Sequence, residues 1–319
     1  MGIGLSGGGS AMGRIVLMAL LPLLLPVTGC FTGIESTPRI NADDAGREMT
    51  RTTSEEAYLA DIGNEPFARW IPGKQWVVTD SKLSILLAGD GDALPPAVGD
   101  TLSYVGCVEV PSVTGGGAVD LRFAGHGGAE YLYRVNASAA ELASRRRVDI
   151  PFTVEMSVID SVAARLDGRT LYTRTSLWYD SIGESVSGRR FVPVTVTDVT
   201  VGNTVCPVRV RFTDADALAR SYFLYLAIGE GAAASRTFPA QFYFDNPRAR
   251  YPSMSDAVWD NIVNSRVAEG MTREECRLAL GAPSDIKRRY GRDRLGELWS
   301  YPDGSYLLFE DGLLWEFRR

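Results

Sequence analysis

The chain contains a single histidine, His126, among 319 residues. Sites that need several histidines for a metal are therefore nearly excluded, and any Ser-His or Cys-His catalysis would depend on this one side chain. No block of basic residues stands out, and 39 Asp and Glu outnumber 33 Lys and Arg, which gives a net charge of -6. A nucleic-acid-binding surface is not indicated. We expect no nucleic acid partner, no metal and no cofactor.

Cysteine is also scarce. Beside Cys30, the chain has only Cys107, Cys206 and Cys276, and none of them forms a Cys-x-x-Cys motif. At most one intramolecular disulfide can form among these three residues, so a disulfide-stapled scaffold is excluded. Because an isolated cysteine often packs as a small hydrophobic residue, we expect buried free thiols.

Long apolar runs are missing except near the start of the chain. Ile15 to Leu25 is almost wholly apolar, follows Arg14, and is well short of the ~20 residues that a helix needs to cross a bilayer. This pattern predicts a signal peptide over residues 1–29, with Met1 or Met12 as the start. No later run approaches spanning length, so everything after Cys30 is expected to lie outside the membrane core.

The signal peptide ends in Val27-Thr28-Gly29-Cys30. This segment resembles the lipobox of bacterial lipoproteins, which implies a thiol-linked diacylglycerol on Cys30, the new N-terminus, and firm anchoring in a membrane of the cell envelope. The alternative is an ordinary secretory signal with an unmodified Cys30. Cleavage removes only Arg14 among the charged residues, so 32 basic and 39 acidic residues remain, a balance of -7. Residues 30–52 are polar and predict a tether.

Residues 53–150 predict a first β module. Thr53 and Glu56 have the spacing of a capping box, and a short helix is expected over 54–62. Short runs of β-forming residues then alternate with turn signals, which favours a small barrel or sandwich. The predicted strands are 75–78, 84–87, 101–110, 119–123 and 131–135.

Residues 151–250 repeat this plan in a second β module. Val158, Val162 and Leu166 recur at helical spacing, and Gly168 is expected to cap the helix that they predict. The predicted strands are 170–179, 191–199, 205–213 and 222–228.

Local sequence also repeats between the two modules. Gly73 to Val77 is similar to Gly168 to Tyr172, and Val119 to Phe123 is similar to Val208 to Phe212. We infer a tandem duplication of a helix and a small β-barrel. In size, strand number and a closing Tyr-rich strand, each module resembles the bacterial Src-homology-3-like barrels.

Residues 251–319 have a different character. Ser255 is a candidate N-cap for one helix, and Thr272 with Glu275 has capping-box spacing at the start of a second helix, which ends at Gly281. Turn signals at 302–305 and at Asp311-Gly312 separate strands that we expect to form a three-stranded antiparallel sheet. Two helices can pack on one side of such a sheet. The apolar face of the first helix is Val258, Trp259, Ile262, Val263 and Val267, and the strands are 297–301, 306–310 and 313–318.

This C-terminal part resembles the SmpA/OmlA (BamE-like) lipoprotein family over about 50 residues. The resemblance lies in Gly270-Met271-Thr272, Glu275, Leu280-Gly281-Ala282-Pro283, Glu297-Leu298-Trp299-Ser300-Tyr301, Leu307-Leu308-Phe309 and Gly312-Leu313-Leu314. It implies two helices on a three-stranded sheet, no catalytic activity, and an outer-membrane lipoprotein that binds other envelope proteins. Members of the family place this domain soon after the lipidated cysteine, whereas two β modules intervene here.

One thiol and imidazole pair, Cys107 and His126, could make a cysteine hydrolase. Cys107, however, lies within an apolar strand, where no helix N-terminus would stabilise a thiolate. Asp90-Gly91-Asp92 has no acidic residue at the twelfth position of an EF-hand, and Gly115-Gly116-Gly117 lacks the Lys of a phosphate loop. These two segments are expected to be turns, and the chain is expected not to be an enzyme.

The C-terminal sheet is rich in aromatic residues, and helices on one side would leave half of them exposed as a docking surface. We expect this surface to include Tyr306, Leu308, Leu314 and Arg318. The sequence thus predicts an α+β, mostly β, lipid-anchored envelope protein that acts as a non-enzymatic adaptor for other envelope proteins. The alternative is a lipoprotein whose β modules bind peptidoglycan or another glycan.

Overall fold

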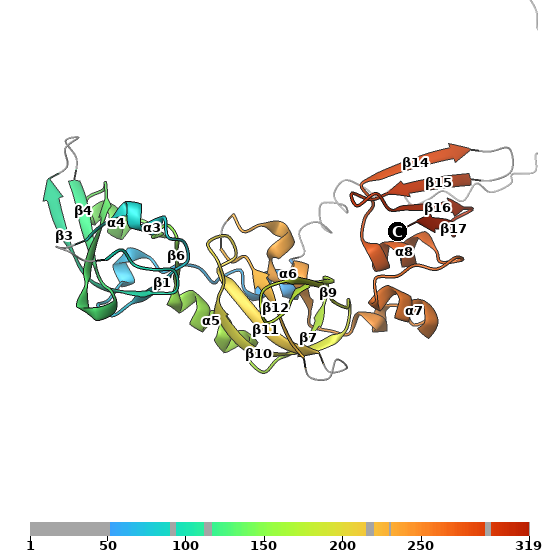
Figure 1. Cartoon of the computed structure of the whole chain (residues 1–319), viewed down its shortest axis with the longest axis horizontal. Coiled ribbons are helices and arrows are strands. Elements are labelled where there is room, and N and C mark those ends of the chain that lie inside the picture. Colours follow the sequence, from blue (N-terminus) through green and yellow to red (C-terminus); the bar gives the residue numbers. More distant parts are fainter. Residues whose placement is uncertain are drawn as a thin grey trace, which may run out of the picture. The chain divides into compact units, whose positions relative to one another are not determined.

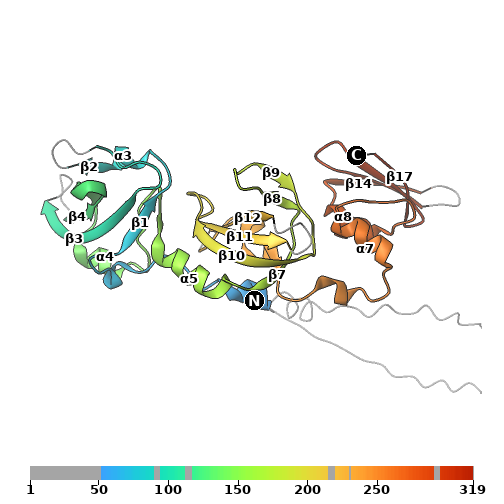
Figure 2. The same ribbon diagram turned by 60° about the horizontal axis from the view of Figure 1, so that its bottom comes forward.

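The computed structural model describes residues 52–89, 94–111, 117–214, 220–229, 231–290 and 295–318, with the side chains of 289 and 290 left out. The predicted signal peptide, Cys30 and the tether up to residue 51 lie outside these residues, as do Asp90-Gly91-Asp92 and Gly115-Gly116. Within the described ranges, strands predominate over helices and every strand pairing is antiparallel (Figures 1 and 2). A mostly β fold is thereby confirmed.

The first sheet has the strand order β2-β5-β4-β3-β1-β6. Its strands are β1 (Gln75–Val78), β2 (Leu87–Gly89), β3 (Thr101–Pro111), β4 (Gly117–Ala124), β5 (Glu130–Val135) and β6 (Thr153–Glu155). Short helices accompany it: α2 (Ser54–Tyr58), η1 (Phe67–Arg69), α3 (Leu83–Leu86), η2 (His126–Gly128) and α4 (Ala139–Ser144).

The second sheet has the order β13-β7-β10-β11-β12-β8-β9. It is preceded by α5 (Met156–Leu166) and consists of β7 (Thr170–Thr173), β8 (Leu177–Tyr179), β9 (Ser185–Ser187), β10 (Pro193–Val201), β11 (Val208–Asp214), β12 (Ser221–Leu226) and β13 (Phe242–Tyr243). The helices η3 (Ala234–Arg236) and α6 (Phe238–Gln241) lie between β12 and β13 in the chain.

The first two sheets share one strand order. Read in reverse, the second sheet has the order β9-β8-β12-β11-β10-β7-β13. Without the additional edge strand β9, its six strands occupy the same positions, and follow one another in the chain in the same sequence, as the six strands β2-β5-β4-β3-β1-β6 of the first sheet. Both sheets also carry a bulge directly after a residue that pairs with a buried phenylalanine. Tyr104 pairs with Phe123 before one bulge, and Val196 pairs with Phe212 before the other. The two phenylalanines are the last residues of the similar segments found in the sequence.

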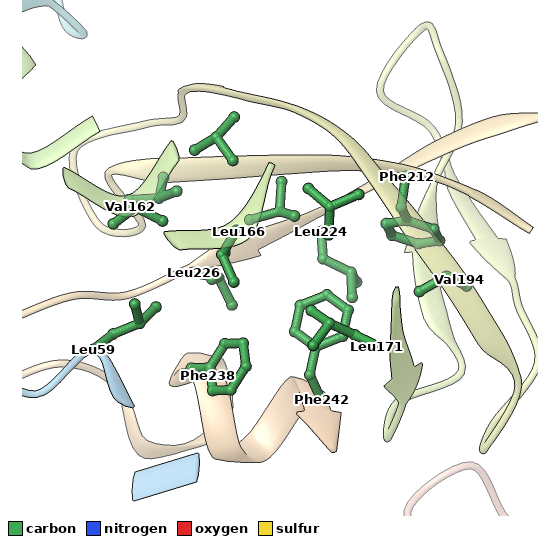
Figure 3. Close-up of a cluster of buried hydrophobic side chains, with 14 of the residues drawn as sticks. Leu59, Val162, Leu166, Leu171, Val194, Phe212, Leu224, Leu226, Phe238 and Phe242 are labelled. Atoms are coloured by element: carbon green, nitrogen blue, oxygen red, sulfur yellow. The ribbon is translucent and has the colours of Figure 1, made fainter. Parts of the chain in front are cut away.

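The core of the second sheet is a cluster of aliphatic and aromatic side chains (Figure 3). Val158, Val162 and Leu166 of α5 are all buried in it, as their helical spacing predicts. Gly168, with φ of 72°, follows the helix in the left-handed conformation that glycine adopts readily. Leu59 also belongs to this cluster, so the helix expected to open the first module packs against the second sheet.

Local differences from the predicted elements have simple causes. Residues 84–87 were expected to form a strand, but α3 covers most of them and only Leu83 of this helix is buried. A short apolar run does not distinguish strand from helix by itself. The strand expected over 170–179 is divided into β7 and β8.

The third sheet has the order β14-β15-β16-β17. Helices α7 and α8 cover one face of it, and side chains of both helices share a core with the sheet (Figures 1 and 2). The elements of this part are η4 (Pro247–Arg250), α7 (Asp256–Val263), α8 (Arg273–Leu280), β14 (Asp285–Tyr290), β15 (Leu295–Ser300), β16 (Tyr306–Glu310) and β17 (Leu313–Arg318).

The expectation of three strands in this sheet is wrong, because β14 adds a fourth. Its sequence, Asp285 to Tyr290, carries four charged residues and no apolar alternation, so it gives no strand signal. Charged side chains are common on edge strands, where they hinder pairing with other chains. In the part of the chain that is described, no helix is long and apolar enough to cross a membrane.

Candidate protein-binding face of the C-terminal sheet

One face of the third sheet packs against α7 and α8. Trp299, Leu307 and Phe309 are at most 1% exposed on this face, and they contact residues of both helices such as Ile262 and Cys276. Thr272 accepts a hydrogen bond from the N–H of Glu275 in the predicted capping box, which starts α8 where it can cover the sheet. This face is therefore closed by the protein itself.

A buried carboxylate lies on this closed face. Oε1 of Glu297 accepts hydrogen bonds from Arg273 Nη1 at 2.7 Å and Arg288 Nε at 3.1 Å, and Oε2 accepts from Trp299 Nε1 at 3.2 Å. Burial would raise the pKa of Glu297, but the Trp299 hydrogen bond and the two arginine charges outweigh it and hold the pKa below its usual value. Glu297 is thus an ionised structural group.

Leu314 also lies on the closed face. It is only 2% exposed, so the prediction that it forms part of a docking surface is wrong. The reason is a β-bulge: Phe309 pairs with Leu314, but Leu308 pairs with Glu316, which leaves Trp315 without a direct partner. The extra residue shifts the alternation of β17, turns Leu314 toward the helices and places Glu316 beside Leu308.

The opposite face of the sheet has no covering element among the described residues, and it contains a groove of about 670 Å³. Tyr306 and Leu308, two of the predicted docking residues, line this groove together with Leu298 and Glu316. The fourth predicted residue, Arg318, pairs with Tyr306 across β16 and β17 and is exposed. We call this surface, made of the outward-facing residues of the four strands, the open face.

Strand register arranges the open face in rows that cross the four strands. Lys287, Leu298, Leu308 and Glu316 are successive cross-strand partners from β14 to β17 and form the first row. The second row, formed in the same way, is Asp285, Ser300, Tyr306 and Arg318.

The two rows contact each other at both edges of the sheet. On β14, Lys287 Nζ lies 3.9 Å from Asp285 Oδ2. At the other edge, the Tyr306 hydroxyl donates to Glu316 Oε1 at 2.6 Å, and this carboxylate raises the pKa of Tyr306.

Sequence reasoning missed Leu298 as a member of the open face. It pairs with both Lys287 and Leu308, so only the register of β14 and β15 reveals that it lies at the centre of the first row. Trp315, at 62% exposed, was also missed, because the bulge that turns it outward has no signal in the sequence.

Cys107 and His126 do not form a reactive pair in the structure. Cys107 lies on β3, within a strand as predicted, but it is exposed, so the expectation of a buried thiol is wrong for this residue; His126 begins the short helix η2. No hydrogen bond between them occurs among the described residues. Burial raises the pKa of Tyr104, and the neighbouring Cys107 side chain raises it further. The same part of the chain holds no group of three His, Cys, Asp or Glu able to bind a metal ion.

No family model, curated protein or solved structure matches the chain. The proposals below therefore depend on the sequence motifs and on the geometry of the open face.

Proposed function

We propose that this protein is a lipid-anchored protein of the bacterial outer membrane that binds other envelope proteins through the open face and has no enzymatic activity. The lipobox-like segment ending at Cys30 supports the anchor. The likeness to the SmpA/OmlA family supports the binding role, and it is part of the proposal that α7, α8 and the third sheet form a domain of that type with one added strand.

The observation that carries the binding role is the partly exposed apolar centre of the open face, which lines the groove. Leu298 and Leu308 are direct partners at the middle of a four-stranded sheet whose other side packs at its centre against α7 and α8. Hydrophobic side chains at the centre of a groove with a charged rim are the usual arrangement at protein interfaces. The rim here is Lys287 and Asp285 on β14, and Glu316 and Arg318 on β17.

The anchor is tested with Cys30→Ser. Cells that produce the unchanged chain should incorporate labelled palmitate into it and retain it in the membrane fraction. The variant should incorporate no label and should accumulate as a precursor or appear in soluble fractions. A processed wild-type chain whose mass shows an unmodified residue 30 would refute the anchor.

The binding role is tested with Leu308→Glu, which places a charge in the groove without touching the closed face. Affinity purification from envelope extracts should recover defined proteins with the wild-type chain, and Leu308→Glu should lose them. Leu177→Glu is the matched control, because Leu177 is 40% exposed on β8 of the second sheet. Equal recovery with both variants would refute the open face as the binding surface.

We propose further that the two sheets of shared strand order are Src-homology-3-like modules that hold the open face away from the anchor. Sedimentation of the mature chain with purified peptidoglycan, unchanged by Leu308→Glu, would instead assign these modules to wall binding.

A further inference from the structure

The four charges at the ends of the first and second rows alternate in sign in both directions. In the first row, Lys287 on β14 stands at one end and Glu316 on β17 at the other. In the second row the signs are reversed, because Asp285 is on β14 and Arg318 on β17. All four side chains are exposed. Such a pattern is complementary to its own copy, since a half-turn about an axis along the strands exchanges the two edges of the sheet.

We propose that the open face binds the open face of a second copy of this chain, with a two-fold axis parallel to the strands between β15 and β16. This inference rests on the proposed function of the same face and names its partner. The rotation places Lys287 opposite Glu316 of the second copy and Asp285 opposite its Arg318. Each contact occurs twice, so four pairs of opposite charge surround the centre.

The same rotation brings apolar side chains together. Leu298 faces Leu308 of the second copy, and Ser300 faces its Tyr306 hydroxyl. In the next row Gly296, which lines the groove, faces Glu310 of the second copy and leaves room for its side chain. An in-plane axis at right angles to the strands would also pair opposite charges, but it would place Leu298 on Ser300 and is disfavoured for that reason.

The size of the face determines where such a dimer forms. Four strands at ~4.8 Å spacing and five residues at ~3.3 Å rise cover roughly 300 Å² per copy. A standard interface buries about 800 Å² per partner, so the dimer is weak in dilute solution. Confinement of both copies to one membrane surface raises their effective concentration and favours the pairing.

The test uses residues 31–319 with an N-terminal histidine tag, attached to vesicles that contain a nickel-chelating lipid. This replaces the native anchor, so the result does not depend on lipidation of Cys30. In a Cys107→Ser background, one chain carries Leu298→Cys and a second, larger tagged chain carries Leu308→Cys. Mild oxidation should form a disulfide between the two chains, because these positions face each other in the proposed dimer.

Charge exchange then tests the arrangement. Lys287→Glu in both chains, or Glu316→Lys in both, should lower the cross-linked yield about tenfold, since two attractive pairs become repulsive. Lys287→Glu in one chain with Glu316→Lys in the other should restore the yield, because every contact is again between opposite charges. With the alternative axis, the mixture of the two variants would not regain the cross-linked yield, since the glutamate introduced at position 287 would face Asp285 of the other chain.

Two control variants, Lys82→Glu and Glu269→Lys, change exposed charges outside the third sheet and should leave the yield unchanged. The dimer is refuted if Lys287→Glu in both chains leaves the cross-linked yield unchanged, or if combining Lys287→Glu in one chain with Glu316→Lys in the other does not restore that yield. If either of these results is found while Leu308→Glu still loses other envelope proteins, the proposed function stands and only the self-association fails. If Leu308→Glu leaves binding of envelope proteins unchanged, and the same substitution in the Leu298→Cys chain leaves cross-linking unchanged, both proposals fail.

Discussion

Replacing Glu297 with glutamine should destabilise the third sheet by about 1–3 kcal/mol. One oxygen of this carboxylate accepts from Arg273 and Arg288, and the other accepts from Trp299 Nε1. A glutamine side chain has a single acceptor oxygen, so its NH₂ group must face either the arginines or the indole N–H. In both orientations a buried donor faces another donor, and a buried donor without a partner costs about 1–3 kcal/mol.

The arginine charges add little to this figure. The side chains of Arg273 and Arg288 are 42% and 59% exposed, so solvent screens their attraction to the carboxylate. The main cost therefore comes from the buried donor left without an acceptor, which is either the glutamine NH₂ or the indole N–H of Trp299, itself only 1% exposed.

Hydrogen exchange measured by mass spectrometry on peptides from β15 and β16 provides the assay, because it reports the opening of this sheet alone. A loss of about 2 kcal/mol should speed exchange of the protected amides roughly 30-fold at neutral pH. Glu269→Gln, at an exposed site in the loop before α8, should leave exchange unchanged.

The loss of stability caused by Glu297→Gln should become smaller as the pH falls. The pKa of Glu297 in the folded protein lies below its ordinary value of 4.5, so the carboxylate contributes stability that is fully present above that value. This contribution is lost as the pH falls through the folded pKa, whereas glutamine does not titrate. The difference between wild type and Glu297→Gln should narrow below about pH 4.5. Two results would refute this account. One is that Glu297→Gln exchanges its amides at the wild-type rate at pH 7, and the other is that the stability difference between the two proteins is the same at pH 3 as at pH 7.

Two substitutions and one labelling experiment test the packing further. Gly188→Ala should destabilise the second sheet by about 1–3 kcal/mol in urea unfolding, because an added Cβ would lie 2.0 Å from the buried Trp178 ring, while Gly63→Ala meets open space and should be neutral. Thr272→Ala should cost about 1 kcal/mol by removing the capping box of α8, and Thr272→Ser should retain most of that stability; equal effects of the two would contradict the capping role. Iodoacetamide at pH 8 should modify the exposed Cys107 but not Cys276, whose pKa burial raises to about 12, and rapid labelling of Cys276 in the native protein would show that the closed face opens.

Local signals in the sequence predicted the helix starts best. Thr53 and Thr272 each occupy the N-cap of a complete capping box with a glutamate three residues later. The turn at Asp311-Gly312 was also predicted, and both residues adopt positive φ. These features depend on neighbours within a few residues, so short motifs are sufficient to find them.

Features that depend on partners far along the chain were missed. The strand β14 has a charged sequence and is held by its pairing with β15, and α3 forms where the residues alone also suit a strand. Tyr306, Leu308 and Arg318 were placed correctly on the open face, since they follow from simple alternation. Leu314 was misplaced and Leu298 was missed, because their positions depend on a bulge and on cross-strand register.

The bulge at Trp315 has a consequence for how this strand can vary in evolution. Deleting that one residue would leave Leu314, Glu316, Phe317 and Arg318 in ordinary alternation, with each still directed to the side of the sheet that it has now. A chain one residue shorter here would therefore keep the residues of both the closed face and the open face, and would lose only the side chain of Trp315. An ungapped sequence alignment of a chain with this residue and a chain without it would align residues of the closed face with residues of the open face, and would underestimate the similarity of the two chains.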